Sequence, residues 1–293
     1  MKEQVVLFGR LKSLLGIITE PHSASVNGCL PAIIILNAGL LHRIGPNRIS
    51  VKIARQMALA GFLAFRFDFS GIGDSGMRDD DLPFEKSSIN ETQEAMNYLS
   101  SVRSINRYII IGICSGANIA FKTAYKDHRV IGVIGINGSY FDNQDPLGLS
   151  RNFENRIQSR YYRKQLFNYK SWLRLITGKS NLHSIVGFLI TKTKDFLYHS
   201  KDISCELNPS TKWNSLVERG VDLFLIYSEG SQAFDIFRLT LENHLNELKT
   251  NGKIRLEVIK NSDHIFTLLW SQNVLTDFVN KWLQSRQRNW ATT

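Results

Sequence analysis

The chain has 293 residues, of which 43% are hydrophobic and 11% aromatic, and its formal net charge is +10. That length and composition suffice for one large domain, or a domain with an insertion, around a substantial buried core. They argue against intrinsic disorder, and the excess of basic residues favours an anionic partner.

Predicted strands and helices alternate along most of the chain. The opening residues 3–21 alternate apolar and polar side chains more strictly and suit an antiparallel edge hairpin. Nearly all-apolar strands are predicted at 31–39, 62–69, 107–114, 130–138, 221–228 and 253–260. Helices are predicted at 49–61 and 85–102, from Ser115, around 234–249 and from Ile265. Because apolar strands separated by helices are covered on both faces, the pattern predicts an α/β fold with a mostly parallel central sheet.

The alternation is interrupted over about residues 140–212. We expect a helical cap inserted into the connections of the sheet, with residues 1–139 and 213–293 as the two parts of the core. Positive charge is concentrated in this cap, because residues 151–194 contain ten lysines and arginines against Glu154 alone, a local charge of +9. Aromatic residues are interleaved with those charges: Tyr161, Tyr162, Phe167, Tyr169 and Trp172.

The positive field of the cap is expected to favour an anionic partner. Candidates are the phosphates of coenzyme A, an acidic acyl-carrier protein, an anionic glycan or lipid, and a membrane surface. Arg160, Arg163 and Lys164 are the candidate binding residues. A solvated helical face with its aromatic side chains packed inward is the alternative. No nucleic-acid partner is expected, because the chain has no recognised nucleic-acid module.

Targeting signals and cysteine usage indicate the cellular compartment. The first 21 residues have neither the uninterrupted apolar region nor the cleavage site of a signal peptide, and no later run reaches the roughly 18 apolar residues that span a bilayer. We therefore expect a cytoplasmic protein without a transmembrane segment. The three cysteines, Cys29, Cys114 and Cys205, are too few for a disulfide framework and lack zinc-ligand spacing. No metal and no cofactor are expected.

The stretch "IIIGICSGANIAF", residues 109–121, predicts a strand, a tight turn and a helix. This is the arrangement of a nucleophile elbow, whose sharp turn leaves room only for small residues two positions before and after the nucleophile. With Cys114 at the apex those positions are Gly112 and Gly116, whereas Ser115 would place Ile113 and Ala117 there. The motif is therefore GxCxG with a thiol nucleophile. A small buried cysteine beside a connecting turn is the alternative.

The residues around this elbow complete a candidate site. Ser115 is expected to contribute its backbone N–H, at a helix N-terminus, to an oxyanion hole, and the positive charge of that terminus favours the thiolate. In the chain order nucleophile, acid, histidine, the base lies in the loop after the last strand. His264, in "LEVIKNSDHIF", occupies that place and is the predicted base.

These motifs resemble those of the α/β-hydrolase superfamily, over almost the whole chain. The resemblance rests on "LNAGLLHRIGPNR" at 36–48, "FRFDFSGIGDS" at 65–75, "GICSGA" at 112–117 and "NSDHIF" at 261–266. Within the superfamily, the chain resembles the cysteine-elbow hydrolases related to the exosortase-associated hydrolases and the serine aminopeptidase-like hydrolases. The resemblance implies the α/β-hydrolase fold.

One stretch of the sequence matches the glycine motif of dinucleotide-binding folds. "GIGDSG", residues 71–76, spells the GxGxxG of a dinucleotide site, but that site needs a helix that begins at the glycines. "MRDDDLP" follows instead, so we expect an ordinary hydrolase loop in which Asp68 and Ser75 make hydrogen bonds to the backbone.

The resemblance also places the acid, and here the sequence departs from it. Such hydrolases usually carry an aspartate three residues after the glycine or serine that closes the penultimate strand, and that position is Ser231. Glu229 and Asp235 remain nearby. Asp235 lies at a predicted helix start, from which it could turn toward His264, and is our preferred acid. A Cys–His pair depends less on an acid than a Ser–His pair does, because a thiol ionises near pH 8.5, far more readily than an alcohol.

The loop after strand 31–39 is expected to supply the second oxyanion donor, the backbone N–H of Leu40 or its neighbour. The same loop contains His42, Arg43 and Arg48, which are candidates for substrate binding at the mouth of the pocket. They suit an ion cluster at the helix entry equally well, with Pro46 as the residue that starts the helix.

A thiol nucleophile attacks acyl carbons readily and yields a thioester, so exchange with thioester substrates is nearly balanced in energy. The sequence therefore predicts an acyl hydrolase or acyltransferase, thioesterase-like, that forms an acyl-cysteine on Cys114 with His264 as base. Its substrate would be an ester or an acyl thioester. The alternative is a catalytically decayed hydrolase-fold protein that binds an anionic partner through its basic cap, and the missing acid at Ser231 is the argument for it.

Overall fold

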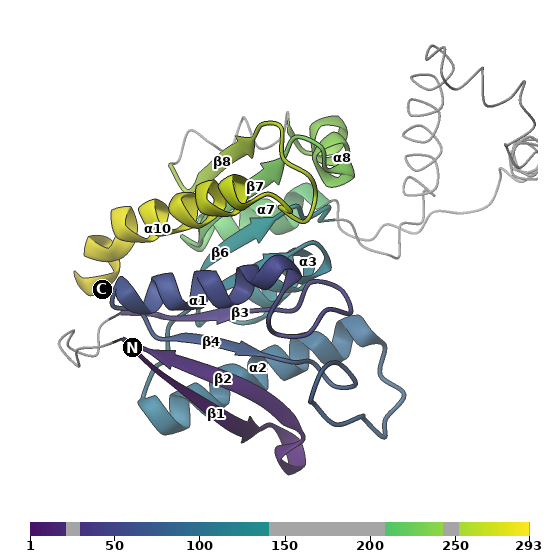
Figure 1. Ribbon diagram of the computed structural model, residues 1–293, viewed down its shortest axis with the longest axis vertical. Helices are drawn as coiled ribbons and strands as arrows, with labels where there is room; N and C mark the ends of the chain where they lie inside the picture. Colours follow the sequence, from purple (N-terminus) through teal and green to yellow (C-terminus); the bar gives the residue numbers. More distant parts are fainter. Residues whose placement is uncertain (22–29, 141–208, 243–251, 293) are drawn as a thin grey trace, which may run out of the picture. The chain divides into compact units, whose positions relative to one another are not determined.

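The computed structural model describes residues 1–21, 30–140, 209–242 and 252–292 (Figure 1). Eight strands form one sheet in the order β1-β2-β4-β3-β5-β6-β7-β8. Their bounds are β1 Lys2–Phe8, β2 Leu14–Glu20, β3 Ala32–Ile35, β4 Ala64–Phe67, β5 Tyr108–Ile113, β6 Val130–Ile136, β7 Asp222–Ser228 and β8 Ile254–Ile259. Strands β1 and β2 form an antiparallel hairpin, β2 pairs with β4 antiparallel, and the pairs from β4 through β8 are parallel. This confirms the predicted hairpin and mostly parallel sheet.

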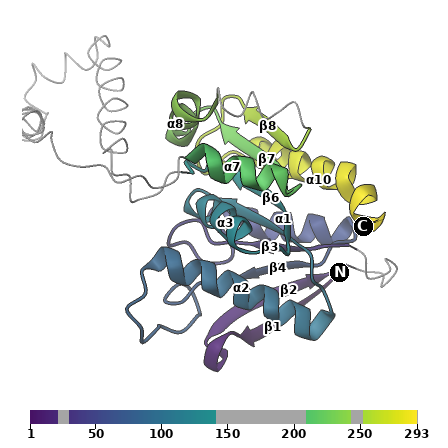
Figure 2. The same cartoon turned by 180° about the vertical axis from the view of Figure 1, so that it is seen from behind.

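Helices cover both faces of the sheet. Their bounds are α1 Ile49–Leu59, α2 Phe84–Arg103, α3 Ser115–Lys126, α7 Pro209–Glu218, α8 Gln232–Thr240 and α10 Leu269–Thr292. Helices α1 and α10 lie on the face that is turned to the viewer in Figure 1, and α2, α3 and α7 lie on the opposite face, seen in Figure 2. None of the described helices is long and apolar enough to cross a lipid bilayer.

The last helix begins later than predicted. We expected it from Ile265, whereas α10 begins at Leu269. The residues before it form a separate turn, because the carboxylate of Asp263 accepts hydrogen bonds from the backbone N–H of Thr267, at 2.8 Å, and from its hydroxyl, at 2.6 Å. His264 lies inside that turn.

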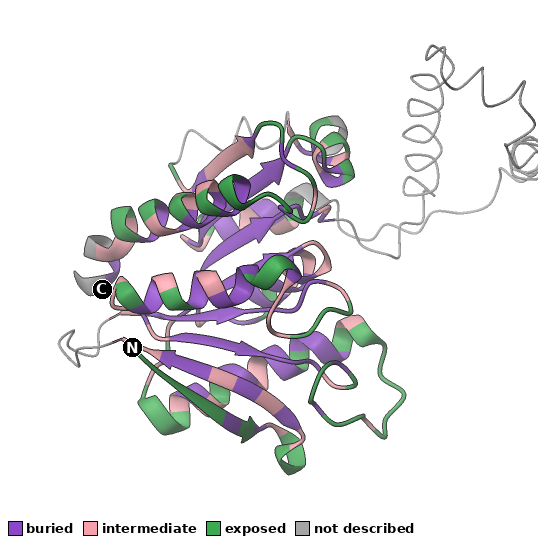
Figure 3. Ribbon diagram, viewed as in Figure 1, coloured by how far each residue is buried: buried purple, intermediate pink, exposed green. Residues whose placement is uncertain are grey.

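Two hydrophobic clusters fix the sheet between its helices. Ile109, Ile111 and Ile113 of β5 belong to the cluster that contains α1 and α10, and Tyr108 and Ile110 belong to the cluster on the other face. All five are 0–1% exposed, as expected for a strand whose successive side chains point to opposite faces. Figure 3 shows the same burial along the central strands. The carboxyl ends of the strands are therefore held rigidly.

The two core parts predicted from the sequence form one compact unit, Met1–Tyr140 and Asn208–Thr293. The predicted cap, residues 140–212, lies almost wholly outside the described residues. Helix α7 begins at Pro209 and packs into the core, with the ring centroid of Trp213 4.3 Å from that of Phe121 on α3. The division of the chain into core and cap stays a prediction.

The loop that spells GxGxxG connects β4 to α2. Helix α2 begins only at Phe84, after a long connection, as predicted for an ordinary hydrolase loop. The hydroxyl of Ser75 donates to the carbonyl oxygen of Asp68, at 2.7 Å, and accepts from the backbone N–H of Leu15, at 3.0 Å. The carboxylate of Asp68 in turn accepts a hydrogen bond from the backbone N–H of Asp74, at 3.2 Å, so Asp68 and Ser75 both hold the backbone of this loop, as predicted.

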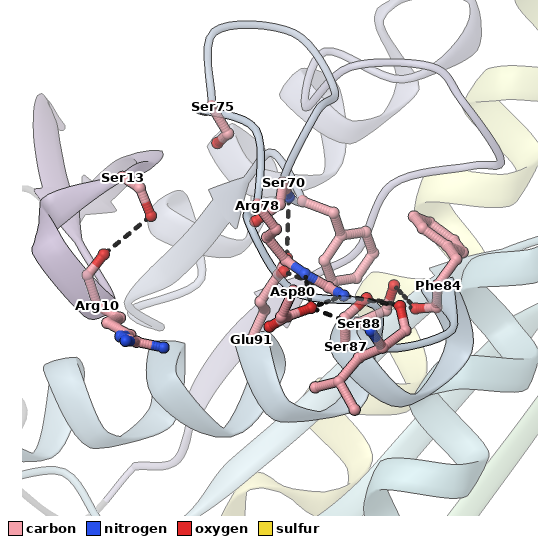
Figure 4. A network of polar contacts seen from close by, with 12 residues as sticks. Arg10, Ser13, Ser70, Ser75, Arg78, Asp80, Phe84, Ser87, Ser88 and Glu91 are labelled. Carbon is pink, nitrogen blue, oxygen red and sulfur yellow. Dashed lines mark hydrogen bonds and ion pairs between the residues drawn. The ribbon is translucent and has the colours of Figure 1, made fainter.

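A buried carboxylate on α2 holds the same loop from its other side (Figure 4). Glu91 accepts a hydrogen bond from the backbone N–H of Ser70, at 2.9 Å, and lies 3.8 Å from the guanidinium of Arg78. Burial raises the pKa of Glu91, while the Ser70 and Arg78 contacts act in the opposite direction. The loop is thus attached to both β2 and α2.

Candidate active site

Cys114 lies at the sharp turn between β5 and α3. Its backbone has φ 56° and ψ −120°, a conformation that residues other than glycine rarely adopt and that is found most often at functional sites. The turn is held on both sides, because Cys114 N–H donates to the carbonyl of Ile136, at 2.8 Å, and Cys114 C=O accepts from the N–H of Ala117, at 3.0 Å. The structure therefore places Cys114, and not Ser115, at the apex of the elbow.

The two glycines of the GxCxG motif lie where there is no room for a side chain. A Cβ atom on Gly112 would overlap the backbone carbonyl of Gly116, and one on Gly116 would overlap the backbone carbonyl of Asn37. Neither neighbour is a flexible side chain that can move away. Gly116 thus lets the helix start approach the loop after β3, which is the loop expected to carry the second oxyanion donor.

Ser115 links the elbow to that loop through its side chain. Its hydroxyl accepts a hydrogen bond from the backbone N–H of Gly39, at 2.9 Å. The N–H of Leu41 donates to the carbonyl of Ala38, at 3.1 Å, so the loop makes a turn. In the part of the chain that the structure describes, the N–H of Leu40 has no partner within the protein, which suits an oxyanion donor. Ser115 is the first residue of α3, so its own N–H is one of the free donors of a helix start.

We expect Ser115→Ala to lower kcat of acylation moderately while KM changes little. The substitution keeps the backbone N–H but removes the acceptor for Gly39, and a hydrogen bond of this kind contributes about 1 kcal/mol, or roughly fivefold in rate. Ser115→Thr, which keeps the hydroxyl, is the matched control. Steady-state kinetics of the three proteins test this, and a Thr variant as impaired as the Ala variant would contradict it.

The side chain of Arg43 is part of an ion cluster. Its guanidinium pairs with the fully buried carboxylate of Asp68 and with Asp74, at 2.6 Å from the latter. Asp68 also accepts from the side-chain N–H of Asn37, at 3.3 Å. Of the two roles left open by the sequence, the structure shows Arg43 in an ion cluster at the helix entry, and a role in substrate binding stays a prediction. Pro46 begins the short 3₁₀ turn Pro46–Arg48 before α1, as expected.

His42 and Arg48 lie on the same loop with exposed side chains. The imidazole Nδ1 of His42 accepts a hydrogen bond from the N–H of Ile44, at 3.4 Å. A role for His42 and Arg48 in substrate binding stays a prediction. Arg160, Arg163 and Lys164, the candidate binding residues of the cap, lie outside the described residues.

His264 is fixed at the carboxyl end of the sheet, where the elbow also lies. Its main-chain carbonyl accepts a hydrogen bond from the side chain of Asn137, at 2.8 Å. Asn137 directly follows β6, the strand beside β5, and it also bonds the backbone N–H of Ser228 at the end of β7, at 2.8 Å. Asn137 is 1% exposed. It therefore ties the His264 loop to the ends of β6 and β7, of which β6 lies beside the strand that carries Cys114.

The side-chain partner of His264 differs from the sequence prediction. The hydroxyl of Ser231 lies 2.8 Å from Nδ1 of His264. Asp235, our preferred acid, is exposed on α8, and the carboxylate of Glu229 accepts from the backbone N–H of Asn261, at 2.9 Å. Among the described residues, no carboxylate lies within ion-pair distance of His264. The prediction of Asp235 is therefore not supported by the structure.

The local geometry explains this difference. Ser231 is the N-cap of α8 and accepts from the N–H of Ala233, at 3.3 Å, which fixes its hydroxyl between the helix start and the imidazole. Asp235 comes one turn later, on the outer face of the helix. Burial lowers the pKa of His264 below its usual 6.5, and the negative charge of Asp263 opposes this only in part. Burial therefore favours the neutral imidazole, the form that can accept a proton.

The sequence missed Asn137 and the role of Ser231. Asn137 could have been found, since it is a polar residue directly after an apolar strand, at the sheet edge where parallel strands present functional residues. In the sequence, Ser231 is apparent only as the position of a missing aspartate. In the described part of the chain, no group of His, Cys, Asp and Glu side chains is arranged to hold a metal ion.

Comparison with known proteins agrees with this architecture. No protein-family model matches the chain, and no curated protein matches it. Among solved structures, the α/β hydrolase GrgF from Penicillium sp. sh18 is 16% identical, with 99% of this chain and all of that one covered and a TM-score of 0.57. An esterase from Pyrococcus furiosus is 14% identical, with 97% and 92% covered and a TM-score of 0.57. A serine hydrolase homologue from Coxiella burnetii is 12% identical, with 96% and 97% covered and a TM-score of 0.55. The chain therefore has the α/β-hydrolase fold.

Proposed function

We propose that the chain is an acyl hydrolase or acyltransferase that forms an acyl-cysteine on Cys114. The observation that carries the proposal is the elbow itself, in which a thiol takes the strained apex conformation between two glycines that have no room for a side chain. A connecting turn alone does not require that strain. The names of the similar structures, among them esterases and a dienelactone hydrolase, agree with this class of reaction.

His264 is the general base of this proposal. It takes the thiol proton on Nε2 while the thiolate attacks the acyl carbon, and the N–H groups of Ser115 and Leu40 stabilise the oxyanion. Collapse of this intermediate forms the S–acyl bond, breaks the bond to the leaving group and returns the proton to that group. A second attack, by water or another acceptor, releases the acyl group.

A second candidate is the decayed binding module. The serine in place of the acid favours it, whereas the retained elbow and the fixed His264 argue against it. Incubation with an acyl thioester or an activated ester, followed by intact-mass measurement, separates the two. We expect an adduct of one acyl group that peptide mapping places on Cys114, and a protein that binds the thioester without forming the adduct would support the binding module.

We also propose that the basic stretch between Arg151 and Lys194 recruits an anionic acyl carrier, coenzyme A or an acyl-carrier protein. Support comes from the local charge of +9 in the sequence, since charges of one sign act on encounter and binding and are screened by salt. The adduct experiment contains the test. Added salt is expected to slow acylation by an acyl-coenzyme A and to leave acylation by a small neutral ester unchanged.

A further inference from the structure

We propose that the acyl-enzyme on Cys114 passes its acyl group to a thiol acceptor and not to water, so that the protein is a thiol-to-thiol acyltransferase. This inference rests on the proposed function and assigns the acceptor that it leaves open. The observation behind it is the neutral partner of the base, because the hydroxyl of Ser231 occupies the position next to Nδ1 of His264.

The tautomer of His264 decides what Ser231 can do. For Nε2 to accept a proton, Nδ1 must carry the hydrogen, and it then donates that hydrogen to the oxygen of Ser231. When Nε2 also takes a proton, the ring becomes a cation. A carboxylate partner forms a charge-assisted hydrogen bond with this cation, roughly twice as strong as the bond to a neutral hydroxyl. Ser231 therefore orients the ring but stabilises its cation poorly.

The other charged groups around His264 do not replace a carboxylate. Asp263 precedes it, but its oxygens bond the N–H and the hydroxyl of Thr267. Glu229, after β7, bonds Asn261, and Asp235 is exposed on α8. Cys114, on the β5–α3 turn, carries the proton to be transferred. Burial lowers the pKa of His264, which agrees with an imidazolium that its surroundings stabilise poorly.

How much a weakly stabilised imidazolium slows deacylation depends on the attacking group. A thiol ionises near pH 8.5 and needs little help from the base, whereas water, with a pKa of about 15.7, must give up its proton almost completely as it attacks. In a serine triad, replacing the carboxylate by an amide lowers kcat by about 10⁴-fold because the ring takes the wrong tautomer, whereas Ser231 keeps the ring oriented and lacks only the charge. The same lack affects attack by water on acyl-Cys114 much more than attack by a thiol.

The proposed reaction balances without any further reactant. The thiol of Cys114 and an acyl thioester give acyl-Cys114 and a free thiol, and an acceptor thiol then gives a new thioester and regenerates Cys114. One carbon–sulfur bond forms and one breaks in each half, and His264 carries the proton between the thiols. Because both bonds are thioesters, the exchange is nearly balanced in energy.

The test compares wild type with Ser231→Asp and Ser231→Asn. Both substitutions keep an N-cap side chain for α8 and are nearly equal in size, but only aspartate carries a charge and only asparagine has N–H donors. Each protein is acylated with a small acyl thioester and freed of reagent, and the loss of the adduct is followed by intact mass in buffer and in buffer with N-acetylcysteamine. The pKa of His264 is measured by NMR titration of the unacylated proteins.

We expect wild-type acyl-Cys114 to persist in buffer and to decay at least about 100-fold faster with millimolar thiol. Ser231→Asp is expected to raise the pKa of His264, because an adjacent carboxylate favours the cation, and to speed hydrolysis at least about tenfold more than it speeds thiolysis. Ser231→Asn is expected to leave hydrolysis slow. Gln232→Glu, which places a carboxylate on the exposed face of α8, controls for added charge.

Three outcomes contradict the inference and can be told apart. Wild-type adduct that hydrolyses as fast without thiol as with it would show that water is the acceptor. An unchanged pKa of His264 and unchanged hydrolysis in Ser231→Asp would show that Ser231 does not control the base. Failure of every variant to form an adduct would refute the proposed function itself, and with it the transfer reaction.

Discussion

Cys114→Ala is expected to abolish the acyl adduct completely. The elbow presents a single nucleophile, and the hydroxyl of Ser115, one residue later, accepts a hydrogen bond from Gly39 in the adjacent loop. Alanine has the same Cβ as cysteine, so it adds no strain at φ 56° and the fold is expected to persist. Intact mass after incubation with an acyl thioester measures the adduct, and thermal unfolding verifies the fold.

Cys114→Ser extends this prediction. A hydroxyl at the apex needs a strong base, and His264 with a neutral partner is a weak one, so the serine variant is expected to acylate at least about 100-fold more slowly than wild type. Replacement of the other two cysteines, Cys29 and Cys205, by serine is the control and is expected to leave the adduct intact. An adduct that still forms on Cys114→Ala would show that another residue is the nucleophile.

Most of the architecture could be predicted because it depends on local patterns. The strand of residues 109–113 is apolar throughout, since both of its faces are covered, and that continuous run identifies a central parallel strand. The elbow could be predicted because backbone contacts at Gly112 and Gly116 exclude every side chain. In both cases the packing partners include distant segments, such as Asn37 beside Gly116, but the residues that satisfy the constraint form a recognisable pattern within a few consecutive positions.

The partners of the base could not be predicted, because they come from separate segments. Ser231 reaches His264 through the start of α8, and Asn137 reaches the same loop from the end of β6. The pairing of Arg43 with Asp68, which directly follows the neighbouring strand β4, likewise joins two separate segments. The order of strands in the sheet decides these contacts, and the sequence does not contain that order directly.

The position of Ser231 in the structure also changes what the missing aspartate implies about activity. In the sequence its absence supported a decayed site, since a serine triad without its acid loses most of its activity. In the structure the serine keeps the histidine oriented, with its hydroxyl 2.8 Å from Nδ1. A thiol nucleophile with an oriented neutral base can still form an acyl-enzyme. The serine in place of the acid therefore limits which acceptors can attack the acyl-enzyme, but it does not abolish acylation.

His264→Ala is expected to slow acylation of Cys114 by about 10³-fold, within the usual contribution of a general base. The loop is expected to keep its place, because Asn137 bonds the main-chain carbonyl and not the ring. In wild type, burial lowers the pKa of His264, so the neutral base persists and acylation stays fast below pH 6.5 before it falls. In the variant, acylation is expected to rise steadily with pH, because hydroxide from the solvent must then remove the thiol proton.

Adduct formation measured by quenched mass spectrometry between pH 5 and 9 tests both parts of this prediction. His128→Ala is the matched control, because His128 is exposed in the connection before β6, at the opposite end of that strand from Asn137. It is expected to follow the wild-type profile. If His264→Ala acylates within tenfold of wild type at pH 7, the base lies in another segment, and the hydrogen bond to Ser231 serves only the stability of the loop.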